Sequence, residues 1–142
     1  MNKKPIIAGN WKMNKTPSEG TIFINEIQRR LPDINNVKVI FFPSTSSLYS
    51  AKTNSPFYLG AQNCHWETSG AYTGETSVEM LKDCNTDYAL VGHSERRQIF
   101  NESNDFLNKK INSLLSNNIK SILCVGETLS ERESQNTELI LE

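Results

Sequence analysis

The sequence contains no long apolar run, and its charges show no excess of one sign. Lysine and arginine number 15 against 16 aspartates and glutamates, a net charge of -1, which argues against a broad electrostatic hold on nucleic acid or membrane. The first apolar stretch is cut short by Asn10 and Lys12, so we expect neither a signal peptide nor a membrane span. The composition therefore favours a cytoplasmic protein that binds neither nucleic acid nor membrane.

Cysteine is also scarce. Cys64, Cys84 and Cys124 show no C-x-x-C spacing, a pattern typical of free thiols in a reducing compartment. His65 follows Cys64, but no second ligand pair stands at zinc-site spacing, so we predict no metal. With 142 residues, 37% hydrophobic and 22% charged, the chain is long enough for one domain with its own core.

Short apolar runs alternate with helical patterns along the chain. We predict strands at 6–12, 37–43, 58–63, 87–93 and 120–127, since each is rich in Ile, Val, Leu, Phe or Ala and is bounded by polar or turn residues. This alternation predicts a parallel sheet covered by helices. A closed or strongly curled sheet and an open, doubly wound sheet of five strands both fit the alternation.

Two of the helices carry specific signals. Residues 16–19 (TPSE) combine a capping box with proline at the first helical position, which predicts a helix start. The apolar stripe that follows consists of Phe23, Ile24, Ile27 and Leu31, and Pro32 ends it. A second stripe consists of Leu107, Ile111, Leu114 and Leu115 and stops at Asn117-Asn118, a pair that tolerates the left-handed turn of a helix end.

Two other segments are unusual. The long connection 65–77 contains Gly70 and Gly74, and loops of this length are usually functional or interfacial, although a solvated excursion would have the same composition. Residues 130–142 begin another helix, whose apolar face starts with Leu139, Ile140 and Leu141. We expect the sequence to end inside that element.

Polar residues follow two of the predicted strands where each strand ends. Asn10 and Lys12 are two residues apart and so share one face of the first strand, and the same parity groups Ala89, Val91 and His93 on the fourth. Small or apolar residues thus lead to a polar group in both strands. This pattern is typical of a curled sheet with a packed interior and a polar mouth.

Each polar residue alone has an ordinary structural explanation. A lone histidine is most often a satisfied structural group, Lys12 fits a surface lysine, and Arg96, Arg97 and Glu95 fit an ion-paired turn. Because these polar residues occur together at one edge of the predicted sheet, they favour a functional site there. A lysine beside backbone amides suits an anionic substrate such as a phosphate ester. A helix start favours a neutral imidazole, which can donate to a carbonyl oxygen as an enediolate forms.

Four segments together resemble the triosephosphate isomerase family: GNWKMN at 9–14, GAYTGETS at 70–77, GHSERR at 92–97 and LCVGE at 123–127. They stand in the family's order and register from Pro5 to about Arg132. The resemblance implies a (β/α)8 TIM barrel, of which residues 1–142 would supply the first five β/α units as a single incomplete domain. It also implies an enzyme of glycolysis and gluconeogenesis that interconverts dihydroxyacetone phosphate and D-glyceraldehyde 3-phosphate with no cofactor.

The resemblance also implies roles for site residues. Asn10 and Lys12 match the family's substrate-binding pair, with Lys12 offsetting the phosphate and enediolate charge. His93 matches the electrophile that polarises the carbonyl, and Glu95 matches the carboxylate behind this pair, with an orienting and electrostatic role.

Other residues match structural features of the family. Thr73, with Gly74 and Glu75, resembles the loop tip that inserts into a partner subunit beside its Asn-Lys pair to make a homodimer. Cys124 resembles an interior cysteine of the fifth strand that serves packing.

A complete barrel needs about 250 residues. The family's general-base glutamate, its lid and its later phosphate loop follow the fifth strand, so we expect the 142-residue chain to be nearly inactive alone. A different interpretation is a non-catalytic half-barrel that acts by dimerisation or by complementing another fragment.

Overall fold

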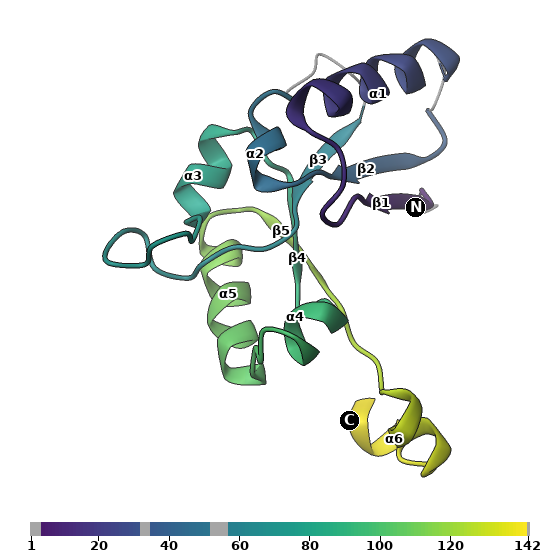
Figure 1. Cartoon of the computed structure of the whole chain (residues 1–142), viewed down its shortest axis with the longest axis vertical. Helices are drawn as coiled ribbons and strands as arrows, with labels where there is room; N and C mark the ends of the chain where they lie inside the picture. Colours follow the sequence, from purple (N-terminus) through teal and green to yellow (C-terminus); the bar gives the residue numbers. More distant parts are fainter. Residues whose placement is uncertain (1–3, 32–34, 52–56, 142) are drawn as a thin grey trace.

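Helices and strands alternate along the chain in the computed structural model, which describes residues 4–31, 35–51 and 57–141 (Figure 1). The strands are β1 (Ile6–Asn10), β2 (Lys38–Phe42), β3 (Tyr58–Ala61), β4 (Tyr88–Val91) and β5 (Lys120–Leu123). The helices are α1 (Pro17–Arg30), α2 (Thr45–Leu48), α3 (Val78–Asp83), α4 (Ser94–Gln98), α5 (Asn104–Ser116), α6 (Leu129–Glu133) and α7 (Thr137–Leu141). None of the described helices is long and apolar enough to span a membrane.

The five strands form one parallel sheet in the order β1-β2-β3-β4-β5. A doubly wound sheet reverses its strand order at a switch point and carries helices on both faces. Here the order is sequential, and within residues 4–31, 35–51 and 57–141 the buried helix residues pack against a single face of the sheet. The architecture is therefore about one half of a (β/α)8 barrel, which confirms the curled sheet and excludes the doubly wound alternative.

The sheet has a helix-facing side and an interior side. On the helix-facing side, Ala89 and Val91 of β4 pack with Leu107 of α5 and with α3. On the interior side, Tyr88 and Leu90 join residues of β2. The prediction that Ala89, Val91 and His93 share the interior face is therefore wrong.

Gly92 is the physical reason for that error. It follows β4 with φ +73, so the strand's alternation stops before His93. A Cβ at this position would lie 2.7 Å from Leu107 Cδ1 and 2.9 Å from Arg97 Nη2. Only glycine fits both the backbone and the space.

All five predicted strands exist, and each begins within one residue of its predicted start. All were predicted too long at the carboxyl end, by one to four residues. Lys12, Gly92 and Gly126 all have positive φ, which strands do not adopt. The chain thus leaves the sheet where the polar motifs begin.

The two predicted helix signals are confirmed. Thr16 Oγ1 accepts a hydrogen bond from the Glu19 amide, and Glu19 Oε2 accepts one from the Thr16 amide, so the capping box starts α1. At the far end of α5, Asn117 is the C-cap and Asn118 has φ 59. Pro32, predicted to end α1, lies outside the described residues.

Some helical predictions need correction. Leu31 and Leu115, placed on apolar stripes by spacing, are exposed. In place of the single helix predicted from residue 130 onward, the described residues form two short helices, α6 and α7, because Gln135 takes φ 59 between them. Leu139, Ile140 and Leu141 are exposed on α7.

The outer edges of the sheet are apolar. Ile6 and Ile7 of β1 and Leu123 of β5 are exposed large hydrophobic residues. Within the described ranges, neither β1 nor β5 has a strand paired to its outer side. Such edges are ready to pair with further chain.

Gly60 offers a test of packing on the interior side of the sheet, and Gly9, on the helix-facing side, is its control. A Cβ at Gly60 would overlap the ring of Phe42, whereas one at Gly9 would make an ordinary contact of 3.5 Å with Phe41. We expect Gly60→Ala to lower the free energy of unfolding by ~1–3 kcal/mol through overpacking. Gly9→Ala should change it by about 0.5 kcal/mol or less. Denaturant unfolding measures both; equal effects would contradict this packing.

Candidate functional site

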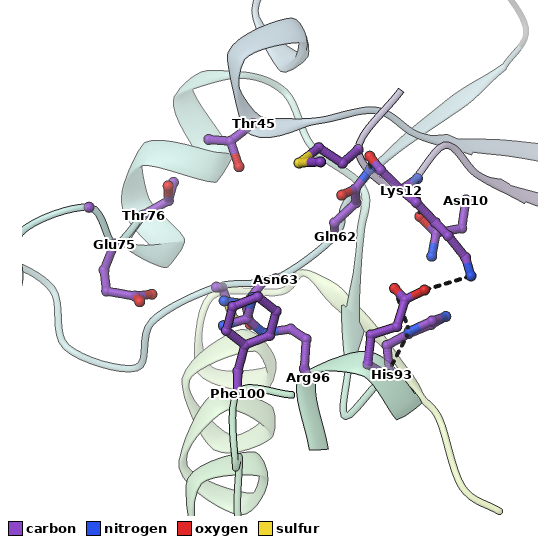
Figure 2. Close-up of a pocket in the computed structure, with 14 residues that line it drawn as sticks. Asn10, Lys12, Thr45, Gln62, Asn63, Glu75, Thr76, His93, Arg96 and Phe100 are labelled. Carbon is purple, nitrogen blue, oxygen red and sulfur yellow. Dashed lines mark hydrogen bonds and ion pairs between the residues drawn. The ribbon is translucent and has the colours of Figure 1, made fainter. Parts of the chain in front are cut away.

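A pocket of about 320 Å³ lies at the carboxyl ends of the strands (Figure 2). Asn10 and Lys12 enter it from the end of β1, His93 from the turn between β4 and α4, and Glu95 from the first turn of α4. The structure thus brings all four predicted polar residues to one rim of the sheet.

Lys12 has a left-handed backbone, with φ 53. This conformation costs roughly 1–2 kcal/mol for a residue with a Cβ, so it needs support. Asn10 Oδ1 accepts a 2.9 Å hydrogen bond from the Lys12 amide. Gln62 Nε2 donates 2.8 Å hydrogen bonds to the carbonyls of Lys12 and Phe42. Both polar groups of the Lys12 backbone are therefore held.

The ammonium of Lys12 meets the carboxylate of Glu95. Lys12 Nζ lies 2.7 Å from Glu95 Oε1, and the two side chains are 53% and 42% exposed. The hydrogen bond from Lys12 holds the pKa of Glu95 below its ordinary value, and the charge of Lys12 acts in the same direction. An exposed ion pair is worth little, so an incoming anion can compete for the ammonium.

His93 is the N-cap of α4. Its Nδ1 accepts a 3.4 Å hydrogen bond from the Glu95 amide. While Nδ1 accepts this bond, a neutral imidazole carries its hydrogen on Nε2, where it can donate. Nδ1 also lies 3.3 Å from Glu95 Oε2, which is an ion pair only if the ring is protonated.

The interpretation of Arg96 and Arg97 as ion-pair partners of Glu95 is wrong, because Glu95 faces Lys12. Arg97 instead joins three elements. Its Nε donates to the Gly92 carbonyl (2.8 Å), its Nη1 to Asn104 Oδ1 (2.7 Å) and its Nη2 to the Cys124 carbonyl (3.1 Å). Arg97 thus ties the ends of β4 and β5 to the start of α5.

A largely buried ion cluster supports one wall of the pocket. It consists of Arg96, Glu102 and Lys110. Glu102 Oε1 lies 2.7 Å from Arg96 Nε and 2.5 Å from Lys110 Nζ, and the Lys110 side chain is only 3% exposed. Lys110 also donates a 2.7 Å hydrogen bond to Asn63 Oδ1. Since Arg96 and Asn63 line the pocket, this cluster fixes part of its wall.

Sequence reasoning missed Gln62, Asn63, Glu102 and Lys110. Gln62 and Asn63 had a usable signal, because they stand at the carboxyl end of an apolar strand, as Asn10 and His93 do. Glu102 and Lys110 had none, since a charged residue on a helix or loop is normally exposed.

The predicted interface residues lie across the pocket. Loop 65–77 extends beside α3 (Figure 1), and its Gly74 and Glu75 line the pocket opposite Lys12. Thr73 is exposed and is not among the lining residues. The long irregular loop is confirmed, with a bridge between His65 and Ser77 at its base.

The cysteines pack rather than react. Cys64 is buried at the pocket wall, and burial raises the pKa of its thiol to about 11. Cys124 packs against the interior cluster, and burial raises its pKa as well. In the described part of the chain, no three His, Cys, Asp or Glu side chains gather as a metal site.

The chain matches known proteins over nearly its whole length. The family model described as triosephosphate isomerase matches residues 5–142. The triosephosphate isomerase of Alkaliphilus metalliredigens is 54% identical over 95% of this chain and 55% of its own length. That of Finegoldia magna is 49% identical over 99% of this chain and 57% of its own. The chain spans about half the length of these curated relatives.

A solved structure is also similar. The crystal structure of triosephosphate isomerase from Bartonella henselae superposes with a TM-score of 0.91 and 33% sequence identity. It covers 98% of this chain, and this chain covers 59% of it. The half-barrel therefore corresponds to part of that barrel.

The Lys12–Glu95 ion pair predicts a pKa change. Replacing Lys12→Met removes the ammonium, so the pKa of Glu95 should rise toward its ordinary value of 4.5. In the parent, the pair stabilises the fold above that value and is lost as pH falls through the lowered pKa. NMR titration of the Glu95 carboxyl measures this. Lys82→Met, an exposed change on α3, is the control; an unmoved Glu95 pKa in Lys12→Met would contradict the pair.

Proposed function

The chain belongs to the triosephosphate isomerase family, and on that premise we propose that it supplies the amino-terminal part of an isomerase for dihydroxyacetone phosphate and D-glyceraldehyde 3-phosphate. In this proposal residues 1–142 are one incomplete barrel domain that works in cytoplasmic glycolysis and gluconeogenesis without a cofactor. The observation that carries it is the convergence of Lys12 and His93 on one pocket.

Lys12 and Asn10 bind the substrate in this proposal. The Lys12 ammonium attracts the phosphate dianion. Binding it breaks an ion pair with Glu95, which costs little because that pair is exposed. Asn10 contributes by holding the Lys12 amide, so the charge is positioned before the substrate arrives. A positioned cation loses less entropy on binding than a free surface lysine.

His93 acts on the carbonyl. When a proton leaves the carbon next to the carbonyl, negative charge builds on the carbonyl oxygen. A hydrogen bond from Nε2–H stabilises that charge as the enediolate forms. The Glu95 amide favours this tautomer through Nδ1, and the Lys12 ammonium offsets the same charge.

In this scheme Glu95 has an orienting role and does not remove a proton from the substrate. Its carboxylate is bound to Lys12 and its pKa is lowered, so it is a weak base. Of the described residues that line the pocket, the other carboxylate is Glu75, on the far loop. The general base is therefore expected from chain that follows these five strands, as the resemblance to the family implies.

Thr73, Gly74 and Glu75 form the proposed dimer contact. They lie on an exposed loop, and a second copy could place this loop against the Asn10–Lys12 end of its partner. The partner subunit would then cover the pocket. Altering Thr73 is expected to weaken such a dimer.

A non-catalytic half-barrel is a second candidate. The observation in its favour is the pair of apolar outer edges at β1 and β5. In that case the chain acts by pairing with a copy of itself or with a complementary fragment, and the polar pocket has no reaction to perform.

The experiment compares two proteins: the 142-residue chain, and a completed barrel in which the chain is continued by the carboxyl-terminal half of the Alkaliphilus metalliredigens relative. We expect isomerase turnover from the completed barrel and almost none from the chain alone. His93→Gln in the completed barrel should lower kcat by about a hundredfold while KM changes little, because the lost hydrogen bond acts on developing charge.

Two outcomes discriminate the candidates, and a third tests the role of His93. Full turnover by the chain alone would mean that the general base lies within it. A folded but inactive completed barrel would favour the half-barrel interpretation. An unchanged kcat in His93→Gln would remove His93 from its role, and Gln98→Asn, an exposed change on the same helix, controls for effects on α4.

A further inference from the structure

A stack of aromatic rings joins loop 65–77 to helix α5. The imidazole of His65 lies 4.2 Å from the Trp66 ring at an interplanar angle of 23°, and 4.3 Å from the Tyr72 ring at 34°. Two rings cannot occupy one face of an imidazole at these distances, so Trp66 and Tyr72 cover opposite faces. His65 is therefore clamped between the start of the loop and the residue before its tip.

The stack continues onto the scaffold. The Trp66 ring lies 5.2 Å from the ring of Phe106 on α5, and Lys109 Nζ lies 5.2 Å from the Trp66 ring. Phe106 and Lys109 lie on a long helix whose other face is packed in the core. The rings thus link the loop to a rigid element.

His65 is nearly buried, 8% exposed, although the loop around it is exposed. Its amide donates to the Thr76 carbonyl (2.8 Å), which closes the base of the loop. Its Nδ1 accepts a 3.1 Å hydrogen bond from the Glu67 amide, which turns the chain after Trp66. The side chain and the amide of His65 therefore hold both the base of the loop and the first part of the loop after Trp66.

The second part of the loop, which leads back to Thr76, depends on Tyr72. The Tyr72 amide donates to the Gly70 carbonyl (3.0 Å), and its carbonyl accepts from the Glu75 amide (3.0 Å), enclosing Thr73 and Gly74. Gly74 takes φ +90, and a Cβ there would meet nothing within 4 Å, so the tip has no packing of its own. The conformation of the tip must therefore come from the loop residues on either side of it.

We propose that His65 is a positioning residue for the loop tip: its imidazole, clamped between Trp66 and Tyr72, holds residues 70–76 in the conformation that presents Thr73 to a second copy of this chain. The partner in this inference rests on the proposed function above. The ordering of the loop within one subunit does not. A loop ordered in advance loses less entropy on docking, so the stack raises the affinity of the dimer.

The experiment uses the completed barrel with two substitutions, His65→Ala and His65→Phe. Amide hydrogen exchange reports the order of the loop, with the amides of α1 as an internal reference. His65→Ala should speed exchange at the Tyr72 and Glu75 amides by about tenfold, because both ring contacts are lost. Exchange in α1 should stay unchanged.

His65→Phe separates stacking from hydrogen bonding. A phenyl ring keeps both ring contacts but has no Nδ1, so protection should return at Tyr72 and Glu75 and stay lost at the Glu67 amide. Sedimentation of the same variants should show a dimer dissociation constant raised by about tenfold in His65→Ala and close to the parent's in His65→Phe.

Exchange rates at Tyr72 and Glu75 that His65→Ala leaves unchanged would overturn the proposal. Faster exchange that His65→Phe does not rescue would also overturn it, since stacking would not be the cause. Faster, rescued exchange with an unchanged dimer would support the positioning role and instead contradict the docking of Thr73.

Discussion

The site depends on the backbone of one residue, Lys12. A left-handed lysine is unfavourable by itself, and two side chains from different strands make it stable: Asn10 holds the amide and Gln62 holds the carbonyl. Because Gln62 also binds the Phe42 carbonyl, the ends of three neighbouring strands share one hydrogen-bond network. This network aims the ammonium across the rim toward Glu95 and His93. In an ordinary extended conformation, the backbone of Lys12 would continue the direction of β1 instead.

Different kinds of interaction stabilise the sheet and the site at its rim. The helix-facing side of the sheet is held by apolar packing, as Ala89, Val91 and Leu107 show, and needs only hydrophobic residues of suitable size. The rim is held by directed contacts such as the three hydrogen bonds of Arg97. Directed contacts tolerate little change of side chain, so the motif residues are specific where the strand residues are not.

How much the sequence could predict follows the same division. Strand positions and the start of α1 were predictable because alternation of apolar runs and the capping box at Thr16 are local signals. The strand ends were not, since a positive φ is rare for lysine and at Lys12 depends in part on Gln62, which lies far along the chain. The burial of Lys110 against Glu102 is likewise a tertiary effect with no local signal. Asn10, Lys12, His93 and Glu95 were found because parallel strands bring their carboxyl ends together.

The most direct test of the central claim changes Gln62, which holds Lys12 but has no proposed contact with substrate. In the completed barrel, inhibition by inorganic phosphate measures how well the ammonium is positioned. Gln62→Leu keeps a similar volume and removes both hydrogen bonds, so we expect phosphate to bind about tenfold more weakly, with an intact fold by circular dichroism. Unchanged phosphate affinity in a folded Gln62→Leu variant would contradict the claim that the held backbone of Lys12 makes the site.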